Sequence, residues 1–172
     1  ASGALAVENY ALANGSNSFT IGAATQNVTG GSGDDTLNTG ALTTIGGVLD
    51  GVSGNDVVHV ETSASLTATL NNIDAVTLAN NVSLTTSINT NALITTALGN
   101  NTVTLSNAGT SSGAIAVENY QLANGTNTFT LGAAAQNLTG GSGDDNVQSG
   151  ALTTISGLLD GVSGNDTLTV QN

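Results

Sequence analysis

The chain has no lysine, arginine, cysteine, proline, methionine or tryptophan among its 172 residues. Because it carries 12 acidic residues and one histidine, its formal net charge is −12. Without cationic side chains it has no electrostatic means of binding DNA, RNA or an anionic lipid surface, so we expect no nucleic-acid partner. No disulfide can form, and the acidic side chains need partners other than lysine or arginine.

Aromatic residues and long apolar runs are also scarce. Aromatic residues make up 2% of the chain, so its core cannot depend on large rings. No apolar run approaches the roughly 20 residues of a membrane helix, so we expect no membrane insertion. The hydrophobic share of 38% is nevertheless too high for a disordered acidic chain. Alanine, valine, leucine and isoleucine diluted with threonine, serine, asparagine and glycine favour an all-β fold built from short strands.

An internal repeat organises the sequence. Residues 2–62 return at 112–172 with an offset of 110, and 43 of these 61 positions are identical. We therefore divide the chain into copy one (1–62), an intervening segment (63–111) and copy two (112–172). Repeats of this kind typically stack and share one core, which predicts one continuous solenoid. Tandem β-sandwich domains are the alternative.

The fine pattern of the chain favours stacked strands. Apolar residues alternate with polar ones, as in β-strands, and Asn-Gly, Gly-Gly and Asn-Asn pairs separate the alternating segments. We predict a parallel β-helix, or β-solenoid, with rungs of roughly 20 residues and a length of about 40 Å. Residues 41–49 and 151–159 could instead form helices, although a Thr-Thr-Ile run disfavours this. The alternating segments are residues 19–21, 58–60, 66–70, 76–78, 82–84, 103–105 and 129–131.

Four glycine-aspartate loops carry the chemistry of the sequence. Residues 30–38 and 140–148 match the pattern Gly-Gly-x-Gly-x-Asp-x-apolar-x, and residues 51–58 and 161–168 are weaker relatives in which valine replaces the second glycine. Glycine allows positive φ, so such a loop can turn its carbonyl oxygens inward. Aspartate adds anionic oxygens, and a flexible oxygen-only loop suits Ca²⁺. Eight of the 12 acidic residues lie in these loops or directly before them.

These loops resemble the nonapeptides of the repeat-in-toxin (RTX) family, whose fold is a Ca²⁺-bound parallel β-roll. Family arrays run their nonapeptides back to back, whereas here the loops are sparse, which favours a wider β-helix that holds Ca²⁺ on some turns. Residues 70–78 are also similar to β-helical parts of bacterial surface-layer proteins. The RTX resemblance implies that the last aspartate of each loop binds the ion together with loop carbonyls. The implied ligands are Asp35, Asp56, Asp145 and Asp166, with Asp34, Asp50, Asp144 and Asp160 as secondary candidates.

Charge supports a bound cation. Neighbouring acids such as Asp34 and Asp35 repel each other unless a cation lies between them, and no lysine or arginine is present to supply it. The alternative is that the loops are ordinary exposed turns, because aspartate and glycine are common turn residues.

Catalytic constellations are weak in the sequence. The chain has no cysteine, and His59 is its one possible imidazole base. Copy two has Thr169 at the position equivalent to His59, so no role of this histidine is shared by both copies. We expect His59 to face solvent and the protein not to be an enzyme.

Three functions fit these features. The first is a secreted, extracellular or cell-surface structural protein: a Ca²⁺-stabilised repeat unit of a surface layer, filament or sheath, or the stalk of a giant repetitive adhesin. Such a unit self-associates by stacking or lateral contacts and has cell-surface polysaccharide as a further partner. The second is an adhesin or an ice- or carbohydrate-binding module that presents threonine ranks such as 126–130 and 102–104. The third is the Ca²⁺-dependent secretion and folding segment of an RTX exoprotein.

Overall fold

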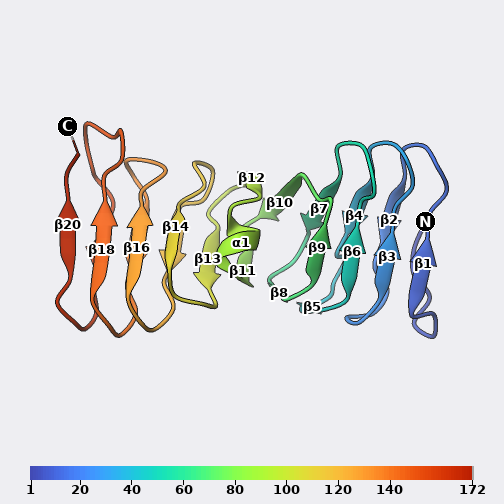
Figure 1. Ribbon diagram of the computed structural model, residues 1–172, viewed down its shortest axis with the longest axis horizontal. Helices are drawn as coiled ribbons and strands as arrows, with labels where there is room; N and C mark the ends of the chain where they lie inside the picture. Colours follow the sequence, from blue (N-terminus) through green and yellow to red (C-terminus); the bar gives the residue numbers. More distant parts are fainter. Residues whose placement is uncertain (172) are drawn as a thin grey trace.

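The protein is a parallel β-solenoid of about nine turns in the computed structural model, which describes residues 1–171 (Figure 1). The predicted all-β parallel β-helix is therefore confirmed, and the tandem β-sandwich is wrong. Every strand pair described is parallel, and stacked residues lie 17–21 positions apart in the sequence. At about 4.8 Å per turn, nine turns give a rod roughly 43 Å long.

Twenty strands and one helix form the coils. A five-stranded sheet contains β2 (Ser18–Thr20), β4 (Thr36–Asn38), β7 (Val57–Val60), β10 (Ala75–Asn80) and β12 (Ile94–Leu98). A seven-stranded sheet, here called the long sheet, contains β5 (Thr44–Ile45), β8 (Ala64–Leu66), β11 (Ser83–Thr86), β13 (Thr102–Leu105), β15 (Asn119–Gln121), β17 (Asn137–Thr139) and β19 (Leu159–Asp160). One four-stranded sheet contains β1 (Asn9–Ala11), β3 (Asn27–Thr29), β6 (Val48–Asp50) and β9 (Thr69–Asn71), and another contains β14 (Thr110–Ser112), β16 (Asn127–Thr130), β18 (Asp145–Gln148) and β20 (Thr167–Thr169).

The core is a stack of inward-facing side chains. Because side chains alternate along a strand, the apolar member of most strands points into the coil. One such column runs through the five-stranded sheet, where Phe19, Leu37, Val58 and Val76 pair in register and are each at most 1% exposed. Each turn buries too little apolar surface to be stable alone, so the coils depend on their neighbours.

The single helix of the described residues is α1 (Ile88–Asn91), which begins after Ser87 as its N-cap. The helices considered for residues 41–49 and 151–159 are wrong, because β5 and β6 lie in the first range and Leu159 begins β19. Leu49 is fully buried, and it pairs with Val28 on the turn before and Leu70 on the turn after. This stacking needs an extended backbone. No helix within residues 1–171 has the length and apolar character that crossing a membrane requires.

Copy two is rotated about the rod axis relative to copy one. β1 lies in a four-stranded sheet, whereas its repeat equivalent β15 lies in the long sheet. In the same way, β2 lies in the five-stranded sheet and its equivalent β16 lies in the second four-stranded sheet. Equivalent strands therefore occupy different faces of a three-sided rod.

The place of α1 explains this rotation. β9, α1 and β14 each follow a strand of the long sheet, namely β8, β11 and β13. They therefore hold the same position in successive turns, and α1 packs against β14. The two four-stranded sheets therefore share one face, with α1 between them (Figure 1). Each successive element on this face lies one turn further along the rod, so β14 lies five turns after β1, with β3, β6, β9 and α1 between them. β15 lies two faces after β14, which adds two-thirds of a turn. One repeat thus covers about five and two-thirds turns.

Candidate functional site

The four glycine-aspartate loops lie at corners of the coil. In copy one they connect β3 to β4 and β6 to β7, and in copy two they connect β17 to β18 and β19 to β20. A bridge between Ser32 and Ser53 joins the first pair of loops, and one between Ser142 and Ser163 joins the second. The spacing of 21 residues thus places the two loops of each copy directly on top of each other.

Backbone and amide N–H groups surround the last aspartate of each full motif. Asp35 is 1% exposed, and its Oδ1 accepts hydrogen bonds from N and Nδ2 of Asn17, both 2.8 Å away. Its Oδ2 accepts a bond from Gly31 N at 3.0 Å. Asp145 in copy two repeats this arrangement with Asn127 and Gly141. Three N–H donors therefore compensate each of these two carboxylates.

The aspartates also link successive turns. Asp35 N donates to Asp56 Oδ1 at 2.8 Å, and Asp56 N donates to Asp74 Oδ2 at 2.8 Å. Together with Asn17, these residues form a column that we call the aspartate ladder. Each carboxylate of the ladder bonds a backbone N–H one turn earlier. In copy two, Asp145 N donates to Asp166 Oδ1 at 3.0 Å.

Asp56 differs from Asp35, the other buried residue of the ladder. It is 1% exposed, and its Oδ2 has no hydrogen-bond partner among the described residues. The equivalent oxygen of Asp35 receives the Gly31 N–H, but Val52, one turn later, donates its N–H to Asp50 Oδ1 at 3.0 Å instead. The replacement of glycine by valine therefore removes the donor that would satisfy Asp56.

Loop geometry shows why valine cannot act like Gly31. A Cβ on Gly31 would collide with the carbonyl oxygen of Ala13 on the turn below. Val52 avoids this conformation with a positive φ of 72° at the centre of a three-residue γ-turn, in which Ser53 N donates to Gly51 O at 3.1 Å. A β-branched residue is strained there. Val162 repeats this backbone conformation with φ of 69°.

The surroundings of Asp56 are rich in oxygen and negative charge. A Cβ on Gly51 would collide with both Asp56 Oδ2 and the carbonyl oxygen of Asn72, so these two oxygens face the same spot. Burial raises the pKa of Asp56, and repulsion from Asp35, Asp74 and Asp34 raises it further, while the hydrogen bond from Asp35 N lowers it. A cation or a proton at this carboxylate would compensate its charge.

A carboxylate and a main-chain carbonyl are hard oxygen ligands of the kind that Ca²⁺ prefers. Within residues 1–171, no three His, Cys, Asp or Glu side chains gather as a metal cluster. An ion at Asp56 would therefore take most of its ligands from main-chain oxygens such as that of Asn72.

The other sequence-predicted ligands lie nearer to the surface. Asp34 and Asp144 are exposed and accept bonds from the backbone N–H of Asn55 and Asn165 on the next turn. Asp50 is half-buried, whereas Asp160 and Asp166 are exposed near the C-terminal end of the rod. Asp56 is therefore the predicted ligand with an unsatisfied buried oxygen.

Two other predicted features have clear places. His59 is half-buried on β7, and its Nδ1 lies 2.8 Å from Thr77 Oγ1 on the next turn, so it joins the stack of outward-facing side chains. The threonine ranks lie on different sheets, with Thr128 and Thr130 on β16 and Thr102 and Thr104 on β13. They do not form one continuous hydroxyl surface.

Sequence reasoning missed two buried glutamines. Gln136 is 2% exposed and accepts a bond from Gly132 N, while its Nε2 donates to the carbonyl oxygens of Ala114 and Val117. Gln26 repeats these contacts in copy one. Each glutamine fixes the irregular segment of the previous turn. The signal available in the sequence was the return of a glutamine at the same place in both copies.

Comparison of the chain with known protein families, curated proteins and solved structures finds no match.

Proposed function

We propose that the protein is the Ca²⁺-stabilised repeat unit of an extracellular structural assembly, such as a surface layer, filament or sheath at the cell surface. The observation that carries this proposal is the buried Asp56 Oδ2, which has no hydrogen-bond partner within residues 1–171 of a chain that contains no lysine or arginine. A buried carboxylate oxygen without a donor is unfavourable unless a proton or a cation compensates it.

Calcium suits this position because the ligands nearby are oxygens. Extracellular Ca²⁺ modules bind with dissociation constants of about 10⁻⁴–10⁻³ M, so such a site fills outside the cell and stays empty in the cytosol. Ion binding would then add to the folding free energy of the rod.

The shape and composition of the chain support a structural role. Parallel sheets run along the rod with one helical turn between them, and the outward-facing positions carry few charges. A chain without lysine and arginine also offers no cleavage site to trypsin-like proteases. These properties suit a fibre or layer exposed outside the cell.

The sharpest test of the ion site exchanges valine for glycine in the second loop. In Val52→Gly, the loop can take the conformation of the first loop and donate its N–H to Asp56 Oδ2. We expect wild-type protein to melt at higher temperature in millimolar Ca²⁺ than in chelator. Val52→Gly should melt higher than wild type in chelator and gain less from Ca²⁺.

Val162→Gly is the matched control for this experiment. Val162 has nearly the same backbone strain, with φ of 69° against 72° for Val52, but the aspartate of its loop, Asp166, is exposed. Relief of strain alone would therefore act in both variants, whereas loss of the Ca²⁺ response should be confined to Val52→Gly. Identical melting of the wild type in chelator and Ca²⁺ would refute the ion site. Electron microscopy of the same samples tests whether filaments or sheets form and dissolve in chelator.

A further inference from the structure

One turn in the middle of the rod is joined to the next by fewer backbone ladders than the turns before it. At the step from β6, β7 and β8 to β9, β10 and β11, the strands pair on all three faces. Soon afterwards two ladders stop: α1 separates β9 from β14 on the face that the two four-stranded sheets share, and β12 is the last strand of the five-stranded sheet (Figure 1). Two of the three faces therefore lose their ladders near α1.

The long sheet is the face whose ladder continues at this place. β11 pairs with β13 over four residues, from Ser83 with Thr102 to Thr86 with Leu105. Within residues 1–171, no backbone hydrogen bond joins α1 to β14, or β12 to residues 113–118 on the next turn. We call the step from residues 88–98 to residues 110–118 the α1 step. Only the long sheet carries a backbone ladder across it among the described residues.

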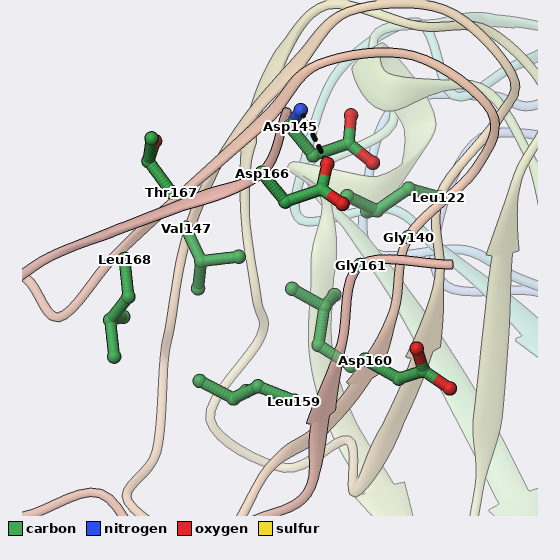
Figure 2. A pocket seen from close by; sticks show the side chains of 11 residues that line it. Leu122, Gly140, Asp145, Val147, Leu159, Asp160, Gly161, Asp166, Thr167 and Leu168 are labelled. Atoms are coloured by element: carbon green, nitrogen blue, oxygen red, sulfur yellow. Dashed lines mark hydrogen bonds between the residues drawn. The ribbon is translucent and has the colours of Figure 1, made fainter. Parts of the chain in front are cut away.

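The aspartate ladder also stops before the α1 step. Its last carboxylate is that of Asp74, on the turn before α1, and the matching column of copy two starts at Asn127, after the step. Where such a column is present it ties successive turns together, as Asp145 N does when it donates to Asp166 Oδ1 (Figure 2). The α1 step therefore lacks this cross-link as well as two of the three ladders.

One buried side chain bonds across the α1 step away from the long sheet. Beside the long sheet, Asn107 Oδ1 accepts Ile88 N at 3.1 Å. Farther from it, Asn91 of α1 is 2% exposed, its Nδ2 donates to Ser112 O at 2.8 Å, and its Oδ1 accepts the hydroxyl of Tyr120 at 3.1 Å. A groove of about 430 Å³ lies at the same step, between residues 88–94 and residues 110–114. The amide of Asn91 thus closes a side of the rod that contains a groove.

From this arrangement we propose that the rod has a hinge at the α1 step, with the long sheet as its fixed side and Asn91 as the residue that holds it closed. A backbone ladder fixes the two strands that it joins, whereas the other two faces can move apart and widen the groove. One core cluster runs through both halves, and its apolar contacts are non-directional, so the halves can tilt without unfolding.

This hinge goes beyond the proposed function and does not depend on the ion site. No acidic residue lies within residues 88–117, so Ca²⁺ at the glycine-aspartate loops does not act at the α1 step directly. In a structural rod, the hinge lets bending occur at one defined turn, while the turns with three ladders keep their shape.

Pulsed electron paramagnetic resonance on the full chain in millimolar Ca²⁺ tests the hinge. Because the chain has no cysteine, nitroxide labels can be attached to two introduced cysteines. Thr29→Cys with Thr128→Cys spans the α1 step on the shared face, and Thr44→Cys with Thr139→Cys spans it on the long sheet. Each pair lies five turns apart, which is about 24 Å. We expect a broad distribution of distances for the shared-face pair and a narrow one for the long-sheet pair.

Replacement of Asn91 should affect the shared-face pair alone. Asn91→Ala should shift the distances of this pair to longer values and leave those of the long-sheet pair unchanged. Tyr120→Phe keeps the ring but removes one bond to Asn91, so it should give a smaller shift in the same direction, and it replaces Asn91→Ala if that variant does not fold. Gln136→Ala is the matched control, because it removes an equally buried amide whose bonds all lie on the C-terminal side of the step. Circular dichroism checks that each variant folds.

Each other outcome overturns the inference. If both pairs give equally narrow distributions in the otherwise unchanged chain, the rod is rigid at the α1 step. If both are equally broad, the rod bends everywhere and the step has no special role. If the folded Asn91 and Tyr120 variants leave the shared-face distances unchanged, or if Gln136→Ala shifts them as much, Asn91 does not hold the hinge closed. The melting response to Ca²⁺ decides separately whether the ion site exists.

Discussion

The replacement of Asp56 by asparagine should stabilise the protein when Ca²⁺ is removed. The amide oxygen can accept the Asp35 N–H as Oδ1 does now, at 2.8 Å. The amide nitrogen then takes the place of the unpartnered Oδ2, beside Gly51 at a spot that the carbonyl oxygen of Asn72 also approaches. The substitution thus removes a buried charge and supplies a donor near a main-chain oxygen.

The size of the effect follows from the penalty of an unsatisfied buried group. Such a group costs about 1–3 kcal/mol and more when it is charged. In a chain of this length, 1 kcal/mol shifts the melting temperature by about 2–4 °C. Asp56→Asn should therefore melt roughly 2–12 °C above wild type in chelator and gain little or nothing from Ca²⁺.

Asp35→Asn is the matched control, one turn earlier in the aspartate ladder. Both oxygens of Asp35 accept N–H groups, from Asn17 and from Gly31. Whichever way the new side-chain amide is oriented, its NH₂ group points at an N–H donor and cannot accept the hydrogen bond that a carboxylate oxygen accepts now. The same substitution should thus destabilise the protein by about 1–3 kcal/mol. We therefore expect the same substitution to raise the melting temperature in Asp56→Asn and to lower it in Asp35→Asn, one turn earlier.

The stabilising effect of Asp56→Asn should also depend on pH. Because burial raises the pKa of Asp56 from 3.8, folding favours its neutral form. That contribution is present below about pH 4 and is lost as pH rises through the folded-state pKa. In chelator, the advantage of Asp56→Asn over wild type should therefore be small in acid and grow towards neutral pH.

Thermal denaturation followed by circular dichroism in chelator gives the melting temperatures of the wild type, Asp56→Asn and Asp35→Asn. If Asp56→Asn is destabilised as much as Asp35→Asn, Oδ2 has a donor in the folded protein and the reasoning fails.

Two further predictions concern buried polar groups. Gln136→Ala should lower the free energy of unfolding by about 2–4 kcal/mol in denaturant melts, because it removes three hydrogen bonds to buried backbone groups; an effect below about 0.5 kcal/mol would show that water replaces them. Burial raises the pKa of Tyr120 to about 12, although the hydrogen bond that its hydroxyl oxygen accepts from Ala114 N lowers it. Folding therefore favours the neutral phenol, so the free energy of unfolding should fall as pH rises from 10 towards 12. Ultraviolet titration should show this phenol ionising late in wild type, and the late step should be missing in Tyr120→Phe.

Alternation and turn residues predicted part of the strands: each of the seven alternating segments overlaps a strand, whereas β3 and β15, for example, lie outside them. The column from Phe19 to Val76 follows from apolar residues at every second position, and the apolar residue two places after each loop aspartate is buried at Leu37 and Val58. The short apolar runs at 41–49 were ambiguous, because a sequence of that length fits a helix turn or two short strands. Only stacking on Val28 and Leu70 decides that Leu49 is in a strand.

The sequence singled out the loop aspartates and favoured the two full motifs over their weaker relatives. Asp35 and Asp56 both occupy the last position of a loop, and the full motif resembles the RTX pattern more closely. In the structure, the closer match is the satisfied carboxylate, because the second glycine supplies an N–H to Asp35. The weaker match lacks that donor, because Val52 turns its N–H towards Asp50. The exchange of glycine for valine thus decides which loop aspartate keeps an unsatisfied oxygen, and similarity to the motif does not reveal this.

Rotation of the repeats has a consequence for any assembly. A unit of 110 residues that covered a whole number of turns would place every equivalent loop on one edge of the rod. Because the unit covers about five and two-thirds turns, the loops of copy one connect the four-stranded sheet to the five-stranded sheet, while those of copy two connect the long sheet to the shared face. Equivalent acidic loops therefore point in directions about one third of a turn apart. Lateral contacts through these loops would bind neighbours on two sides of the rod, which suits a layer or bundle.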